Sequence, residues 1–168
     1  MRMIAGFVLG LALIAGPALA QEASPPPQLS AAVDPAKTLA EGQAFLAQNA
    51  KAPGVVTTAS GVQYKVVKAA PKGAPGPKLG DLVKVNYEGK LLNGTVFDSS
   101  FERGKAVIMP LDGLIPGWLE IVPLMHVGDE WTLWLPAAQA YGERAAGPIP
   151  ANSTLVFRLQ LVGMLAVD

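Results

Sequence analysis

The chain has 168 residues with 13 basic and 13 acidic side chains, one histidine and no cysteine. The lack of cysteine excludes disulfides, thiolate metal sites and thiol nucleophiles, and one histidine excludes a site built from several imidazoles. A net charge of zero removes the general electrostatic argument for binding nucleic acid or an anionic membrane. The length is sufficient for one domain and a short additional element.

The first 20 residues predict a secretory signal peptide. Arg2 precedes an apolar run from Ile4 to Ala15, and Ala18-Leu19-Ala20 offers the small residues of a cleavage site. The run is shorter than the ~20 residues that a membrane-spanning helix needs. We therefore expect cleavage after Ala20, a periplasmic location (or secretion if the cell has no outer membrane), and no membrane attachment after cleavage.

Residues 21–34 are expected to form a linker, because Pro25-Pro26-Pro27 is typical of a stiff spacer. Asp34 followed by Pro35 is typical of a helix start. A short amphipathic helix is predicted from there to about Asn49, within an N-terminal segment of residues 35–52.

The apolar side of this predicted helix carries Leu39, Gln43 and Leu46, with Phe45 beside them. Such a helix is able to pack on its own domain or on a second copy of the chain. It is too short for a convincing coiled coil, so we expect a monomer rather than a dimer.

The remaining residues, 53–168, mostly alternate between apolar and polar side chains, which is typical of half-buried strands. Strands are predicted at residues 62–66, 83–88, 95–99, 105–109, 130–135 and 154–162. Asn93-Gly94 predicts a hairpin. Pro116 to about Leu124 is the helical candidate in this region, and Pro123 is expected to end that helix early. The pattern predicts an α+β domain with mostly antiparallel strands and one internal helix.

The sequence offers little basis for hydrolytic, phosphate-binding or metal chemistry. A serine triad would need His126 as its base, yet His126 lies in a segment that is typical of a turn. The glycines at 73, 76 and 80 are not followed by the Gly-Lys-Ser/Thr of a phosphate-binding loop. We expect no cofactor and no metal. Two classes of function are left: an enzyme that works by shape, desolvation and hydrogen bonding, and a protein that only binds its partner.

Six ordered blocks between Thr57 and Met164 resemble the FKBP-type peptidyl-prolyl cis-trans isomerases. They are VNYEG (85–89), GTVFDSS (94–100), LIPGW (114–118), MHVG (125–128), AYG (140–142) and IPANSTLVF (149–157). The preceding residues 58–64 are similar to the lead-in strand of bacterial exported members. The resemblance implies an antiparallel sheet curled around one short helix, a hydrophobic pocket between them, and isomerisation of Xaa-Pro bonds in exported proteins.

The resemblance also implies the residues of that pocket. Those expected to carry the isomerisation are Tyr87, Phe97, Asp98, Ile115, Trp118, Tyr141 and Phe157, and those expected to contact the substrate are Arg103, Val107, Leu114 and Ile149. Trp118 would be the floor, and Tyr87, Phe97 and Phe157 the walls. The Ile115 backbone N–H and the Tyr141 hydroxyl would donate to substrate carbonyls. Val107 stands where the family usually has an aromatic residue, so one wall is expected to be smaller.

Several of these residues also have ordinary structural explanations. Trp118 on an apolar helix face suits a core, Asp98 suits a turn, and Arg103 suits a solvated surface. Trp131 and Trp134 are interpreted as structural. The alternative function is a peptide-binding module or holdase chaperone that uses the same pocket with little turnover. The expected partners are proline-containing unfolded or folding polypeptides and macrolide inhibitors, with no nucleic acid.

Overall fold

The structure, a computed structural model, describes residues 33–167. The predicted signal peptide and most of the predicted linker lie outside these residues. The described elements are α1 (Pro35–Asn49), β1 (Val56–Thr57), β2 (Gln63–Lys68), β3 (Leu82–Leu91), β4 (Val96–Ser99), β5 (Val107–Pro110), η1 (Leu111–Gly113), α2 (Pro116–Ile121), η2 (Val122–Leu124), β6 (Glu130–Leu135), η3 (Ala137–Gln139) and β7 (Leu155–Leu165).

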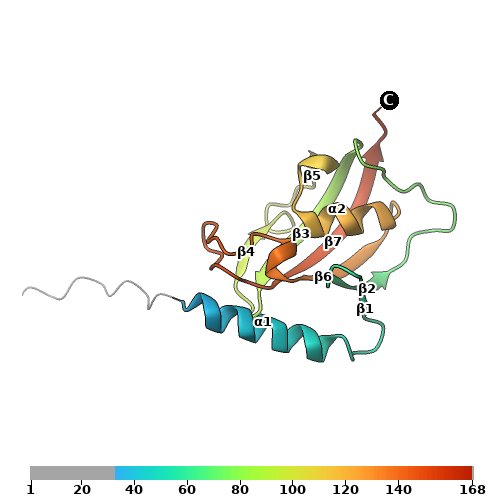
Figure 1. The fold of residues 1–168 in the computed structure, drawn as a ribbon. Helices are drawn as coiled ribbons and strands as arrows, with labels where there is room; N and C mark the ends of the chain where they lie inside the picture. The colour runs from blue at the N-terminus through green and yellow to red at the C-terminus, as the bar shows by residue number, and fades with distance from the viewer. Residues whose placement is uncertain (1–32, 168) are drawn as a thin grey trace, which may run out of the picture. The chain divides into compact units, whose positions relative to one another are not determined.

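The strands form one antiparallel sheet in the order β1-β2-β6-β7-β3-β4, with β5 also paired to β3 (Figure 1). The central pair is β3 and β7, which face each other from Leu82 opposite Leu165 to Leu91 opposite Leu155. Helix α2 lies against one face of the sheet (Figure 1). The predicted α+β fold, a curled antiparallel sheet packed around one short helix, is confirmed.

The core lies between α2 and this face of the sheet. In β6, Trp131, Leu133 and Leu135 are buried, whereas the residues between them are only half-buried, as expected for a strand with one covered face. Helix α2 contributes Trp118 and Ile121 to the same core. Its approach is close, because a Cβ atom at Gly117 would lie 2.3 Å from Leu135 Cδ2.

Helix α2 ends early, as its sequence predicts. The α-helical hydrogen bonding stops at Ile121, and residues Val122–Leu124 continue as a single 3₁₀ turn. Pro123 has no backbone N–H to donate to the preceding turn, which is why the helix does not extend over it. The structure also shows a two-residue strand, β1, and two further 3₁₀ turns that the sequence pattern did not predict.

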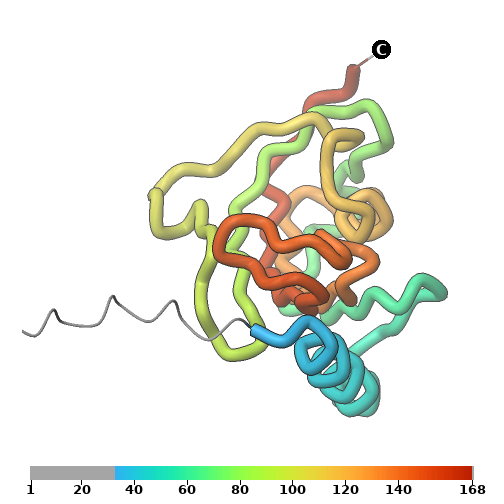
Figure 2. The backbone as a smooth tube through the Cα atoms, turned by 60° about the vertical axis from the view of Figure 1, so that its left-hand side comes forward, coloured from blue at the N-terminus to red at the C-terminus, as the bar shows by residue number. Residues whose placement is uncertain are grey.

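Helix α1 begins where the sequence predicts, because the Asp34 carboxylate accepts a hydrogen bond from the Ala36 N–H at 2.9 Å. Within residues 33–167, neither this helix nor any other is long and apolar enough to cross a bilayer. It packs on the domain beneath the 140–152 loop and the β3–β4 hairpin (Figure 2). Asn152 donates to the Pro35 carbonyl at 3.1 Å, and Asn49 donates to Gln63 at 2.8 Å.

The packed face of α1 matches the expected one only in part, because Phe45 and Leu46 are half-buried but the other two positions are not. Gly42 is its buried residue, whereas Leu39 is 39% exposed and Gln43 is exposed. A Cβ atom at Gly42 would lie 2.3 Å from Thr154 Oγ1, so the helix approaches the domain closely because this position has no side chain. Apolar periodicity alone did not locate this contact.

Candidate functional site

A pocket of about 210 Å³ opens between α2 and the sheet. Its lining residues come from β3, β4, β5, β7 and α2, from η1 and the two residues before α2, and from the loop between η3 and β7. They are Tyr87, Phe97, Asp98, Met109, Gly113, Leu114, Ile115, Trp118, Tyr141 and Phe157. Most of these side chains are apolar, with two hydroxyls and one carboxylate as the polar exceptions.

Four aromatic rings of the pocket contact one another edge to face. Trp118 lies 5.5 Å from Tyr87 and 5.4 Å from Phe157 between ring centroids, with interplanar angles of 84° and 82°. Phe97 lies 5.7 Å from Phe157 at 86°. These are favourable geometries for aromatic pairs, so the rings brace one another. Trp118 is 4% exposed, and its indole Nε1 is buried without a hydrogen-bond partner among the described residues.

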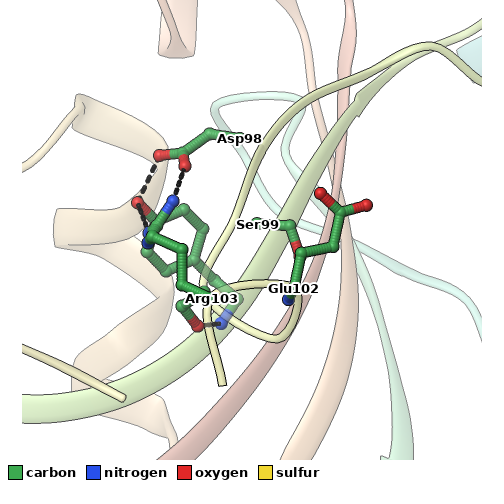
Figure 3. Close-up of polar contacts among 6 residues, drawn as sticks. Asp98, Ser99, Glu102 and Arg103 are labelled. Atoms are coloured by element: carbon green, nitrogen blue, oxygen red, sulfur yellow. Dashed lines mark hydrogen bonds and ion pairs between the residues drawn. The ribbon is translucent and has the colours of Figure 1, made fainter. Parts of the chain in front are cut away.

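One edge of the pocket carries a group of three polar side chains (Figure 3). The Tyr87 hydroxyl donates to one carboxylate oxygen of Asp98, and Arg103 Nη1 donates to the other. Arg103 Nη2 also donates to the Tyr87 hydroxyl oxygen at 3.3 Å. Each member of the group therefore contacts both of the others, which holds the Asp98 carboxylate in one orientation.

These contacts change the ionisation of the group. Partial burial raises the pKa of Tyr87, and its hydrogen bond to Asp98 raises it further. For Asp98, desolvation acts to raise the pKa, but hydrogen bonds from Tyr87 and Arg103 outweigh it and hold the pKa below its ordinary value. The hydrogen bond to Asp98 raises the pKa of Arg103. Asp98 is therefore an anion and Tyr87 a neutral hydroxyl near pH 7.

The two serines after Asp98 serve the backbone. Ser100 Oγ accepts a hydrogen bond from the Tyr87 N–H at 2.8 Å. Ser99 Oγ accepts one from the Glu102 N–H at 3.2 Å, in the turn that brings Arg103 back to Asp98 (Figure 3). Both serines are buried; the Ser100 bond joins the turn to β3, and the Ser99 bond closes the turn itself. Their hydroxyls therefore have structural roles here.

Most residues that the resemblance names come together in the pocket, although they are spread over a long stretch of sequence. Three of them are not in its lining. Arg103 contacts the pocket edge only through its hydrogen bonds to Asp98 and Tyr87. Ile149 is buried in the core. Val107 does not line the pocket, and Met109 of the same strand lines it instead. The functional roles of all these residues remain predictions.

Two further residues, Met109 and Gly113, line the pocket, although the sequence analysis did not predict them there. In β5, Met109 lies two residues after Val107 and pairs with Val83. Period-two alternation puts Val107 and Met109 on the same face of the strand, so this signal was available in the sequence. Among residues 33–167 there is no group of three or more histidine, aspartate or glutamate side chains placed to hold a metal ion.

Comparison with known proteins supports the family resemblance seen in the sequence. The family model described as FKBP-type peptidyl-prolyl cis-trans isomerase matches residues 73–162, and the model described as the domain amino terminal to it matches residues 19–66. The chain is 48% identical over 127 residues to the FKBP-type 22 kDa peptidyl-prolyl cis-trans isomerase of Escherichia coli, covering 75% of this chain and 61% of that protein.

It is also 50% identical over 124 residues to the isomerase FkpA of Aeromonas hydrophila, covering 74% of this chain and 46% of that relative. The chain thus spans about half to three-fifths of the length of these curated relatives. The crystal structure of FkpA from Escherichia coli superposes with a TM-score of 0.76 at 38% identity, covering 80% of this chain and 62% of that one. The chain belongs to the family of FKBP-type peptidyl-prolyl cis-trans isomerases.

Proposed function

We propose that this protein accelerates the cis–trans isomerisation of Xaa-Pro bonds in exported polypeptides. One observation carries the proposal: the pocket combines a floor of Trp118 and walls of Tyr87, Phe97 and Phe157 with a single oriented carboxylate. An aromatic cavity of about 210 Å³ suits a proline ring and the peptide bond before it.

The reaction needs no nucleophile and no metal, because no covalent bond is made or cut. Its barrier, ~18–20 kcal/mol, comes from the amide resonance that twisting breaks. A twisted amide has lost charge separation on its oxygen, so a water-poor apolar pocket favours it over the planar ground state. Binding that favours the twisted form lowers the barrier, and each ~1.4 kcal/mol of this preference gives a factor of ten in rate.

The residues divide the work as follows in this proposal. Trp118 and Phe157 hold the proline ring and exclude water. The Ile115 backbone N–H and the Tyr141 hydroxyl, which is on a 43% exposed side chain, donate to carbonyls of the flanking chain. Asp98, held by Tyr87 and Arg103, places one fixed negative charge beside the reacting bond.

The setting of the reaction is part of the same proposal. The N-terminal sequence pattern supports export, with cleavage after Ala20 and an isomerase domain over residues 53–168. The substrates would be proline-containing polypeptides that are unfolded or still folding. Macrolide inhibitors would compete for the pocket. Helix α1 packs on its own domain through Gly42, which supports a monomer.

A tetrapeptide assay tests the activity directly. We expect the purified protein to accelerate the cis-to-trans conversion of a Xaa-Pro tetrapeptide, rapamycin to block it, and Asp98→Val and Tyr141→Phe to weaken it. A folded sample that gives no acceleration would overturn the proposal. If that sample still bound unfolded polypeptide, the pocket would belong to a holdase chaperone instead.

A further inference from the structure

A second groove lies on the same face of the sheet, toward the end of α2. It has a volume of about 420 Å³ and is bounded by β2, by residues 69–73 and by the turn between η2 and β6. Its lining includes Val66, Leu124, His126 and Trp131. Val66 and Leu124 are 43% and 49% exposed, so the groove presents apolar surface to solvent. We call it the β2-edge groove.

The strand beside this groove has a free edge. Strand β2 pairs with β6 from Gln63 to Lys68, but β1 covers it only at Gln63 and Tyr64. Within residues 33–167, the other edge of residues 65–68 has no strand paired to it. An exposed sheet edge is able to accept an extended peptide as an added strand, with neighbouring pockets selecting its side chains.

The charges around this edge favour an acidic occupant. Lys65 and Lys68 flank the two valines of β2, and Lys72 lines the groove. In the described part of the chain, none of these three lysines lies within 4 Å of a carboxylate, since each ion pair found there involves other cations. An acidic segment would therefore meet lysines that are still available for pairing.

The nearby carboxylates do not neutralise the positive charge of these lysines. Asp129 is 4% exposed and accepts hydrogen bonds from the Ala70 N–H at 2.6 Å and the His126 N–H at 2.7 Å. Glu130, opposite Lys68 in the register, accepts a hydrogen bond from Arg158 at 2.7 Å. Both acidic groups therefore already have partners in the fold.

The same charges argue against a second copy of the chain as the occupant. Antiparallel pairing of residues 65–68 with the same residues of another copy would place Lys65 opposite Lys68. Like charges directly opposite each other destabilise a strand pair. A client segment with carboxylates around apolar residues would instead match both the lysines and the exposed Val66 and Leu124.

We propose that the β2-edge groove binds an extended segment of the client polypeptide, one that carries acidic and apolar side chains and is remote from the Xaa-Pro bond in the pocket. This rests on the proposed function only in taking a polypeptide as the substrate. The groove then adds affinity for long substrates and contributes nothing to tetrapeptides, which are too short to reach it.

The test compares short and long substrates on one variant, Lys68→Glu/Lys72→Glu/Leu124→Asp. We expect its activity on the tetrapeptide to be unchanged. For a proline-limited refolding protein we expect KM to rise about tenfold, equivalent to about 1.4 kcal/mol of lost binding, with kcat unchanged. The matched control, Lys51→Glu/Lys84→Glu, alters two exposed lysines that line neither the pocket nor the groove and should leave both activities unchanged.

A direct binding experiment keeps this proposal separate from the catalytic one. The proline-free peptide EVTVTVE, added to the purified protein, should shift the NMR signals of residues 65–68 and of the Trp131 indole N–H, and the peptide KVTVTVK should not. This measurement reports peptide binding to the groove even if the protein has no isomerase activity. The proposal would be overturned by shifts confined to the pocket, by equal shifts with both peptides, or by no shifts at all. The lysines of β2 would then serve only to prevent the edge strand from pairing with another chain.

Discussion

The Tyr87 hydroxyl on β3 donates a hydrogen bond to the Asp98 carboxylate on β4, and both side chains face the pocket. The ring of Tyr87 also packs edge-on against Trp118 at 5.5 Å. The position of the carboxylate is therefore tied, through Tyr87, to the ring of Trp118. A change in any of these three residues would disturb both the polar edge and the apolar wall.

Replacing Asp98 with Asn tests the polar group by its pH dependence. The folded pKa of Asp98 lies below the ordinary value of about 3.9, so its ionisation stabilises the fold above that pH, and this contribution is lost as the pH falls through the folded pKa. We expect Asp98→Asn to lower the free energy of unfolding at pH 7 and to flatten its decline in acid. Urea unfolding from pH 7 down to pH 2 measures both effects.

Glu102→Gln is the matched control for this measurement, because Glu102 is an exposed carboxylate in the same turn. Its acid dependence should stay close to that of the parent protein. An equal flattening in both variants would show that the Asp98 contacts contribute nothing of their own.

Gly89 leaves room for the rings that wall the pocket. A Cβ atom at this position would lie 2.4 Å from Phe97 Cζ and 2.9 Å from Phe157 Cε1. We expect Gly89→Ala to displace the ring of Phe97 and to lower kcat/KM on a tetrapeptide by about tenfold, a loss of about 1.4 kcal/mol of transition-state binding.

Gly113→Ala is the control for this change within the same pocket. A Cβ atom at Gly113 would meet only Pro110 Cγ at 3.7 Å, an ordinary van der Waals distance. The kcat/KM of this variant should stay within about twofold of the parent value, a difference below about 0.5 kcal/mol. Equal losses in the two variants would show that the Phe97 position is not the cause.

Met109 should matter more to the reaction than Val107, because only Met109 lines the pocket. We expect Met109→Ala to raise KM for tetrapeptides with a large residue before proline, since truncation removes a flexible wall that adapts to bulky groups. Val107→Ala should leave KM nearly unchanged. Measuring KM across a series of residues before proline checks this, and a larger effect at Val107 would contradict the assignment.

Gly42 should be required for packing of α1 but not for catalysis. A larger residue cannot fit, because Thr154 Oγ1 would lie 2.3 Å from its Cβ atom. We expect Gly42→Leu to cost about 1–3 kcal/mol of unfolding free energy, as other overpacked contacts do. Its tetrapeptide activity should stay close to that of the parent.

Ala40→Leu provides the comparison on the exposed side of the same helix, and it should leave stability nearly unchanged. Denaturant unfolding and the tetrapeptide assay on both variants give the result. A loss of activity in Gly42→Leu that matched its loss of stability would show that α1 supports the pocket after all.

Local patterns were sufficient for the longer elements, although not for β1 or for the 3₁₀ turns η1 and η3. Alternation located β6 at Glu130–Leu135, Asp34-Pro35 located the start of α1, and Pro123 located the end of α2. These signals succeed because they depend on backbone chemistry within a few residues: a capping carboxylate, a missing N–H, a two-residue period.

Strand periodicity, helix ends and the six motif blocks are all properties of neighbouring residues, so they were enough to predict the fold class and the family. Which residues contact one another became known from the three-dimensional structure. Met109 rather than Val107 reaches the pocket, and Gly42 rather than Leu39 makes the contact of α1. Those outcomes depend on how closely segments distant in sequence approach one another, and that distance is set by packing of the whole domain rather than by any local pattern.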